Sequence, residues 1–149
     1  GQRIAQEYEG RIQSNDMIVD NCAMQLVMRP EQFDVMVTTN MFGDILSDEV
    51  SGLVGGLGLA PGANIGIHAS IFEAVHGSAP DIAGKGIANP AAQMLAAAMM
   101  LDHLGELARG NKVRAAIEAA IVQDHVRTRD LGGTASTRDF GDAVAKRVA

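Results

Sequence analysis

The sequence predicts an α/β fold in which a sheet is layered by helices. Apolar runs at residues 17–19, 33–38 and 71–75 have the length and composition of short buried strands. Helical patterns lie between and after these runs, as expected where helices cover a sheet. Aromatic residues make up only 3% of the chain and Trp is absent. The core therefore has to be built from aliphatic side chains and Met.

The bulk properties exclude several classes of protein. The net charge is −6 and no cluster of Lys and Arg offsets it, so nucleic acid is not expected as a partner. The most apolar stretch, residues 91–101, is too short to span a bilayer and is interrupted by Gln93, so no membrane span is expected. Cys22 is the only cysteine. It cannot form an internal disulfide, which fits the cytoplasm, with the mitochondrial matrix as the alternative.

The N-terminal part of the chain begins with helix-forming residues. Residues 2–8 have helix propensity but no capping residue before them, which indicates a chain that opens inside a helix and belongs to a longer protein. After the run at residues 17–19, Asp20 and Asn21 are expected to end the strand and cap a helix. Pro30 is expected to stop that helix about two residues before it.

The middle of the chain combines a helix with a glycine-rich segment. A helix is predicted over residues 43–54, directly after the strand at 33–38. Residues 52–66 carry six glycines, which we expect to allow turns and close backbone packing. The third strand, residues 71–75, leads into a long loop of small and turn-forming residues, 76–86.

The C-terminal part reads as three helices. Asn89 as N-cap and Pro90 in the first helical position predict a buried helix that runs to about residue 107. Asn111 is expected to cap the next helix. The pair Ser136 and Asp139 resembles a capping box for the last one. The apolar stripes of these two helices are Val113, Ile117 and Ile121, and then Phe140, Val144 and Val148.

Two aspartates stand four residues apart at the start of the predicted helix 43–54. Asp44 and Asp48 share a helix face, and their mutual repulsion is relieved if a cation lies between them. Asp20 ends a different predicted strand and can reach a shared site. Oxygen ligands of this kind suit Mg²⁺. The alternative is that Asp44 caps the helix and Asp48 faces solvent, and spacing alone favours this alternative.

The loop at residues 76–86 has the chemistry of a phosphate site. Gly77, Ser78 and Ala79 offer backbone N–H groups, and the loop ends near the start of a buried helix. Neither the Rossmann nor the P-loop glycine spacing occurs in it. The alternative is a rigid structural loop, with His76 as an ordinary hydrogen-bonded histidine.

Two long motifs carry a family resemblance. The pattern N-x-x-G-D-x-x-S-D over residues 40–48 and the run F-E-x-V-H-G-S-A-P-D-I-A-G-K-x-x-A-N-P over residues 72–90 resemble the β-decarboxylating dehydrogenases. That family includes isocitrate, 3-isopropylmalate, homoisocitrate and tartrate dehydrogenases. The resemblance extends from about residue 18 to about residue 144 and reverses the preference stated above for the two aspartates.

The resemblance implies a metal site shared between two subunits. Mg²⁺ or Mn²⁺ would be held by residues matching Asp44 and Asp48 of one subunit and Asp20 of the other. A homodimer would then be the functional unit, acting on a small hydroxy-acid substrate. The family's catalytic tyrosine and lysine lie upstream of the matching segment, so no catalytic residue is assigned in this chain.

The resemblance also implies NAD as the cofactor. Asn89 matches the family's adenine-contacting asparagine, and Asp81 is placed to bind ribose hydroxyls and to repel the 2′-phosphate of NADP. NADP-preferring members usually carry a Lys-Tyr pair where this chain has Asp81 and Ile82. The implied cofactor-binding residues are Glu73, His76, Gly77, Ser78, Ala79, Pro80, Asp81, Ile82 and Asn89.

The implied fold is that of the isocitrate/isopropylmalate dehydrogenases, which is α/β but not a Rossmann fold, and here only its C-terminal part. Residues 1–55 resemble the later part of the smaller, dimer-forming domain and residues 56–149 the later part of the larger, nucleotide-binding domain. The implied reaction is NAD-dependent conversion of isocitrate to 2-oxoglutarate and CO₂. The alternatives are 3-isopropylmalate or homoisocitrate as substrate, and a non-catalytic subunit or inactive fragment.

Asp81 gives a direct test of the cofactor prediction. In the full-length enzyme, Asp81→Lys replaces a carboxylate that favours ribose hydroxyls with a cation that favours a phosphate. We expect the ratio of kcat/KM for NAD to that for NADP to fall by about tenfold or more. Steady-state kinetics with both nucleotides measures it, and an unchanged ratio would show that Asp81 does not set the preference.

Overall fold

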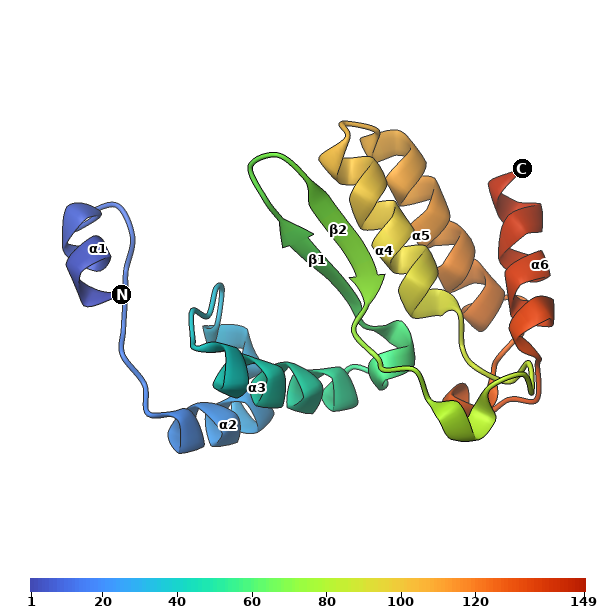
Figure 1. The fold of residues 1–149 in the computed structure, drawn as a ribbon, viewed down its shortest axis with the longest axis horizontal. Helices are drawn as coiled ribbons and strands as arrows, with labels where there is room; N and C mark the ends of the chain where they lie inside the picture. Colours follow the sequence, from blue (N-terminus) through green and yellow to red (C-terminus); the bar gives the residue numbers. More distant parts are fainter. The chain divides into compact units, whose positions relative to one another are not determined.

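The chain folds into two units, Gly1–Leu53 and Val54–Ala149. A computed structural model describes all 149 residues. The first unit is entirely helical (Figure 1). Its elements are α1 (Gln2–Glu7), α2 (Val19–Met28), the short 3₁₀ helix η1 (Pro30–Gln32) and α3 (Asn40–Leu53).

Helices α2 and α3 pack together to form the core of the first unit. Cys22 and Leu26, one turn apart on α2, are buried against Leu46 of α3. Helix α2 ends at Met28, as Pro30 predicts, because a residue that precedes proline disfavours the helical conformation. Helix α3 begins at Asn40, three residues earlier than expected, so Asp44 lies inside the helix and does not cap it.

The two strands predicted in this unit are wrong. Residues 17 and 18 form no strand and Val19 already belongs to α2, while residues 33–38 are neither strand nor helix. A strand needs a neighbour to satisfy its backbone N–H and C=O groups, and no other strand exists in this unit. Val35 and Val37 are 84% and 90% exposed. Neither the strand nor the burial predicted for residues 33–38 is therefore found in the structure.

The second unit contains the only sheet of the chain, an antiparallel hairpin. Strand β1 (Pro61–Ile65) pairs with β2 (Ser70–Ala74), with Pro61 opposite Ala74 and Ile65 opposite Ser70. Strand β2 confirms the third predicted strand to within one residue. Strand β1 was not predicted, because Pro and Gly in its sequence are typical of turns. Proline is nonetheless compatible with the first residue of an edge strand.

Three helices complete the second unit. They are α4 (Ala91–His103), α5 (Leu107–Val122) and α6 (Thr137–Val148). Helix α4 contacts both strands and α5, and α5 in turn contacts α6 (Figure 1). The 3₁₀ helices η2 (Leu57–Leu59), η3 (Pro80–Ile82) and η4 (Arg129–Leu131) lie in the connections. The buried core residues are Ala91, Ala116, Ile117, Ala120, Phe140 and Val144.

The boundary between α4 and α5 differs from the prediction. Gly105 adopts a left-handed conformation with φ of 83°, which ends α4 at His103. Helix α5 can then start at Leu107, and Asn111 lies within it instead of capping it. The stripe that includes Ile117 packs into the core as predicted.

The capping box predicted for α6 is confirmed. The Ser136 hydroxyl oxygen accepts a hydrogen bond from the Asp139 backbone N–H at 3.1 Å, and the Ser136 N–H donates to Asp139 Oδ2 at 3.0 Å. Hydrogen bonds from the Ser136 hydroxyl, and then from its N–H, lower the pKa of Asp139. Phe140 and Val144, one turn apart on α6, are buried behind the cap.

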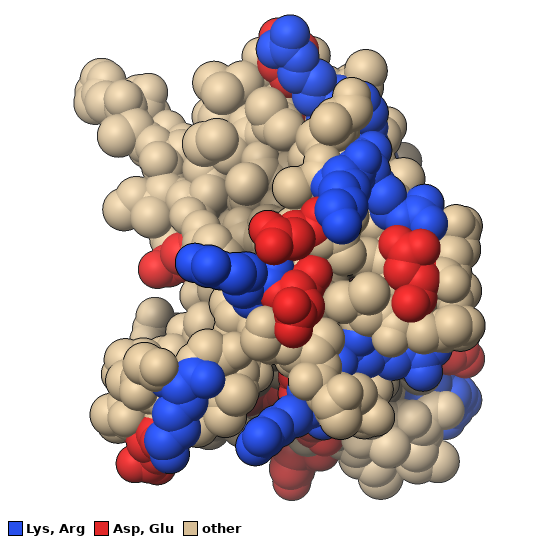
Figure 2. Space-filling model, turned by 90° about the vertical axis from the view of Figure 1, so that its right-hand side faces the viewer, with Lys and Arg blue, Asp and Glu red and all other residues tan.

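Surface charges of both signs are interspersed. Figure 2 shows Lys and Arg next to Asp and Glu on the face that it presents, without a large patch of one sign. One pair, Arg147 and Asp124, links α6 to the end of α5 through two hydrogen bonds of 2.7 Å. No helix combines the length and apolar character that a membrane crossing requires.

The capping box gives a prediction for stability. Ser136→Ala removes the side-chain acceptor for the first turn of α6 and should lower the free energy of unfolding by about 1 kcal/mol. Urea unfolding followed by circular dichroism measures it. Thr134→Ala is the matched control, because Thr134 is exposed and its side chain makes no hydrogen bond in the structure.

The same box predicts how this difference depends on pH. Because folding lowers the pKa of Asp139, the stabilisation is present above the ordinary aspartate pKa of about 3.9 and is lost as the pH falls through the folded-state value. The Ser136→Ala difference should therefore shrink in acid. A difference of the same size at neutral pH and at acid pH would contradict the role given to Asp139.

Candidate functional site

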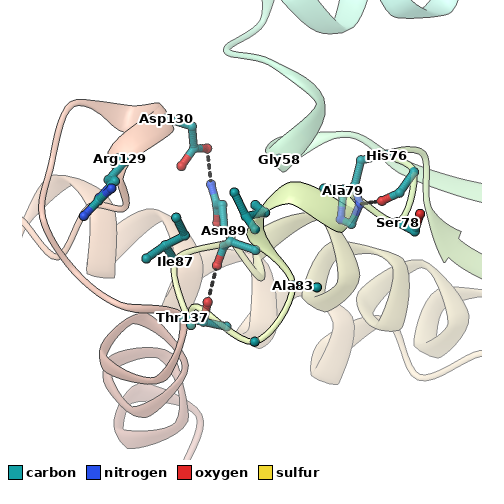
Figure 3. A pocket seen from close by; sticks show the side chains of 15 residues that line it. Gly58, His76, Ser78, Ala79, Ala83, Ile87, Asn89, Arg129, Asp130 and Thr137 are labelled. Atoms are coloured by element: carbon teal, nitrogen blue, oxygen red, sulfur yellow. Dashed lines mark hydrogen bonds between the residues drawn. The ribbon is translucent and has the colours of Figure 1, made fainter.

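A cavity of about 680 Å³ opens in the second unit, where the loop before α4 meets η2 and the segment before α6 (Figure 3). Six of the nine predicted cofactor-binding residues line it. They are His76, Gly77, Ser78, Ala79, Ile82 and Asn89. The structure therefore brings together most of a set that the sequence spreads over a strand end, a loop and a helix start.

The loop is shaped by a left-handed residue at its centre. Ala79 has φ of 44°, an uncommon and mildly strained conformation for a residue with a Cβ atom. It turns the chain into η3, where the Ala79 carbonyl accepts a hydrogen bond from the Ile82 N–H at 3.1 Å. This turn brings Ile82 back to the same cavity as His76.

The first part of the loop keeps its backbone donors free. The N–H groups of Gly77, Ser78 and Ala79 make no hydrogen bond within the chain, and all three residues are exposed. The His76 ring atom Nδ1 lies 3.0 Å from the Gly77 carbonyl oxygen, a local contact that occupies this nitrogen of the ring. Consecutive free N–H groups are the usual means by which a loop binds an anion.

Asn89 joins the cavity to the start of α4. Its Oδ1 accepts a hydrogen bond from the Ala91 N–H at 3.0 Å. The predicted helix start is wrong by one residue, because α4 begins at Ala91 and Pro90, not Asn89, occupies the N-cap position. Asn89 Nδ2 donates to Asp130 Oδ2 at 2.8 Å (Figure 3). Asn89 is only 8% exposed. Both ends of its amide are therefore fixed by the fold.

The segment that closes the cavity from the other side was not predicted as part of the site. Arg129, Asp130 and Thr137 line the cavity. Thr137 donates from its hydroxyl to the Ala88 carbonyl at 2.6 Å and from its N–H to the Gly86 carbonyl at 2.8 Å. The sequence marks this segment as a glycine-ended loop, but no local pattern connects it with residues about 40 positions earlier.

Three predicted residues lie outside the cavity lining. Glu73 on β2 accepts a hydrogen bond from Asn64 Nδ2 at 3.0 Å, and Pro80 and Asp81 begin η3, where both are exposed. Their roles toward a nucleotide stay predictions. Arg129, which does line the cavity, makes no ion pair in the chain, and it is the one cationic side chain at the site.

The three predicted metal-binding aspartates lie in the first unit. Asp44 and Asp48 are exposed one turn apart on α3, and Asp20 is exposed in the first turn of α2. Asp44 Oδ2 accepts a hydrogen bond from Asn40 Nδ2 at 3.2 Å, and none of the three makes an ion pair with Lys or Arg. No group of three possible metal ligands gathers within one copy of the chain.

The donor set of α3 fits a hard divalent cation. Two exposed carboxylates on one helix face, free of Lys and Arg, are the oxygen ligands that Mg²⁺ and Mn²⁺ take, with the remaining positions filled by substrate and water. The prediction assigns Asp20 to the site of a second subunit, so a single copy of the chain does not test that arrangement.

The fold and the cavity together define an α/β protein with an exposed loop whose backbone N–H groups are free, and comparison with known proteins gives its family. The family model for isocitrate/isopropylmalate dehydrogenase matches residues 1–144. The isocitrate/homoisocitrate dehydrogenase of Thermus thermophilus is 62% identical over 133 residues, which cover 89% of this chain and 40% of that protein. The homoisocitrate dehydrogenase of Methanocaldococcus jannaschii is 57% identical over 137 residues, covering 92% and 39%.

The solved structures agree with this assignment. The crystal structure of isocitrate dehydrogenase from Methylococcus capsulatus matches with a TM-score of 0.93 at 53% identity, covering 99% of this chain and 44% of that one. The chain belongs to the isocitrate/isopropylmalate dehydrogenase family and has part of its α/β fold, which confirms the predicted fold class. It spans about two fifths of the length of the curated relatives it matches.

Gly58 gives a prediction for the integrity of the cavity. A Cβ atom at this position would lie 2.7 Å from Asp130 Oδ2 and 3.1 Å from Asn89 Cβ. Gly58→Ala should therefore force these side chains apart and destabilise the protein by about 1–3 kcal/mol, measured by urea unfolding. Gly77→Ala is the control, since a Cβ there meets no heavy atom within 4 Å. Equal unfolding midpoints for the two variants would contradict the tight packing of Gly58.

Proposed function

We propose that the protein is an NAD- and divalent-metal-dependent dehydrogenase that oxidatively decarboxylates a 2-hydroxy acid, with isocitrate as the substrate. The observation that carries this proposal is the convergence of six predicted cofactor-binding residues on one cavity. Because the chain covers only 40% of its relative from Thermus thermophilus, the activity proposed is that of the whole protein. No catalytic tyrosine or lysine is assigned within this chain.

The cavity would hold the nucleotide by its phosphates and its base. The free N–H groups of Gly77, Ser78 and Ala79 would bind phosphate oxygens, while Ile82 and Asn89 would contact the adenine. Asp81, exposed beside the cavity lining, would accept hydrogen bonds from ribose hydroxyls. Bound NAD supplies the acceptor for a hydride from the substrate carbon.

The metal would be held by carboxylates from two helices and two subunits. Asp44 and Asp48 of one copy would provide two ligands and Asp20 of a second copy the third. A divalent ion at such a site supplies a Lewis acid that makes the substrate hydroxyl more acidic and stabilises negative charge on its oxygen. Asp44 and Asp48 would hold the ion at a fixed place on α3.

A homodimer follows from this proposal, and the surface of the first unit supports it. Helices α2 and α3 expose several large apolar side chains, which in a monomer would remain in contact with water. Met28 and Met41 are both 62% exposed, and Ile45 is 57% exposed. A second copy packed on these helices would cover them.

The free Cys22, buried in the same unit, fits a cytoplasmic location.

Homoisocitrate is the second candidate substrate. The names of the two relatives from Thermus thermophilus and Methanocaldococcus jannaschii, 62% and 57% identical, both include homoisocitrate. The family description also includes isopropylmalate. A non-catalytic subunit is less well supported, because a subunit without chemistry would have no need to keep Asp20, Asp44 and Asp48.

The test is an assay of the full-length protein with NAD and Mg²⁺. Isocitrate, homoisocitrate and 3-isopropylmalate are supplied separately, and NADH formation is followed by its absorbance. We expect the highest kcat/KM for isocitrate, and removal of Mg²⁺ with a chelator should abolish the reaction with every substrate. A higher kcat/KM for homoisocitrate than for isocitrate would identify homoisocitrate as the substrate.

The metal assignment has its own control. Asp48→Asn keeps the size of the side chain but removes a charged ligand, and should lower kcat by about a hundredfold or more. Glu49→Gln, the neighbouring residue on α3 but on a different face, should leave activity within about twofold. Full activity of Asp48→Asn would contradict the metal site, and absence of NADH from all three substrates would contradict the enzymatic proposal.

A further inference from the structure

A continuous chain of hydrogen bonds runs from a buried threonine to the start of α4. Thr128, which is fully buried, donates from its hydroxyl to Asp130 Oδ1 at 2.6 Å. The other carboxylate oxygen, Oδ2, accepts from Asn89 Nδ2 at 2.8 Å. Asn89 Oδ1 in turn accepts from the Ala91 N–H at 3.0 Å. Each group in this series of hydrogen bonds is therefore held by the next.

These contacts allow only one orientation of the Asn89 amide. An ionised carboxylate can only accept hydrogen bonds, so Asp130 has to face the NH₂ group of Asn89. The Ala91 N–H can only donate, so it has to face the amide oxygen. Rotating the amide by half a turn would place oxygen against oxygen and donor against donor. The fold thereby places Asn89 Nδ2 against Asp130 and Asn89 Oδ1 against the Ala91 N–H. A hydrogen-bond network in which every member has its partner is expected to fix side chains in this way.

One hydrogen of Asn89 Nδ2 remains after the bond to Asp130. Because Asn89 lines the cavity, this hydrogen is the donor that the side chain can offer to a bound molecule. The Nδ2 group of an asparagine carries two donors. A purine ring has nitrogen acceptors at its edge that such a donor can bind.

We propose that Asp130 is a positioning residue, which holds the amide of Asn89 so that its N–H binds the base of the nucleotide. This inference rests on the proposed binding of NAD in the cavity. Thr128 fixes the carboxylate from one side, and Gly58 leaves it room on another, since a Cβ at Gly58 would lie 2.7 Å from Asp130 Oδ2. Asp130 thus links the segment before α6, which the sequence did not predict as part of the site, to Asn89, which it did predict.

The proposal distinguishes the base end of the nucleotide from its other end. Asp130→Ala in the full-length enzyme removes one of the two contacts that hold the Asn89 amide, so ADP-ribose, which carries the adenine, should bind about tenfold more weakly. Nicotinamide mononucleotide, which has no adenine, should bind as before. In the steady state the KM for NAD should rise by a similar factor, while kcat stays within about twofold. Isothermal titration calorimetry and initial rates measure these changes.

A conservative variant separates positioning from a general structural role. Asp130→Asn still offers an oxygen to Asn89 and an NH₂ group to the Thr128 hydroxyl, which can accept it by rotating. It should therefore restore most of the ADP-ribose affinity. Thr128→Val keeps the buried volume and removes only the support of the carboxylate, and is expected to weaken ADP-ribose by a few-fold. This variant also tests the proposal if Asp130→Ala fails to fold.

The outcomes are distinct. Unchanged ADP-ribose affinity in Asp130→Ala and Thr128→Val would overturn the positioning role, as would an equal loss for nicotinamide mononucleotide, which a structural defect would cause. A wild-type enzyme that binds neither NAD nor ADP-ribose would instead overturn the proposed function, and this inference with it.

Discussion

The side chain of Asn89 is the constraint on which the second unit depends. Its Oδ1 accepts from the N–H of Ala91, the first residue of α4, and its Nδ2 donates to Asp130 in the segment before α6. A helix start without such a partner leaves backbone donors unsatisfied, and a buried amide without partners costs free energy. One residue therefore stabilises a helix and joins the two sides of the cavity. The Asn89 side of the cavity is consequently part of the folded core.

Helix α4 makes this arrangement rigid because it is built from small side chains. Ala91, Ala92, Ala96 and Ala98 are fully buried. Small residues let the hairpin and α5 approach the helix axis closely, and Ala loses little conformational entropy in a helix. The loop that carries His76 and Ala79 runs from the end of β2 to the start of this helix. Both of its ends are therefore anchored in elements that pack on each other.

The sequence predicted those parts of the fold that are encoded locally. The capping box at Ser136 and the helix stop before Pro30 each depend on a few adjacent residues. Strand β1 was missed because its Pro and Gly residues are typical of turns, although its partner β2 follows after a short loop. Asp130 was missed because its partner Asn89 lies 41 residues earlier in the chain. Periodicity and turn chemistry give no information about a pairing over that distance, so the second half of the cavity could be seen only in the structure.

The wrong strand at residues 33–38 bears on the proposed metal site. Val35 and Val37 are almost fully exposed, and leaving such side chains in water forgoes about 1.5–3 kcal/mol each. The 149 residues supply no cover for them, whereas the matched relatives are more than twice as long as the aligned region. Helix α3 begins two residues after this segment. A surface that covered these valines would therefore also hold the direction of α3, and with it the positions of Asp44 and Asp48.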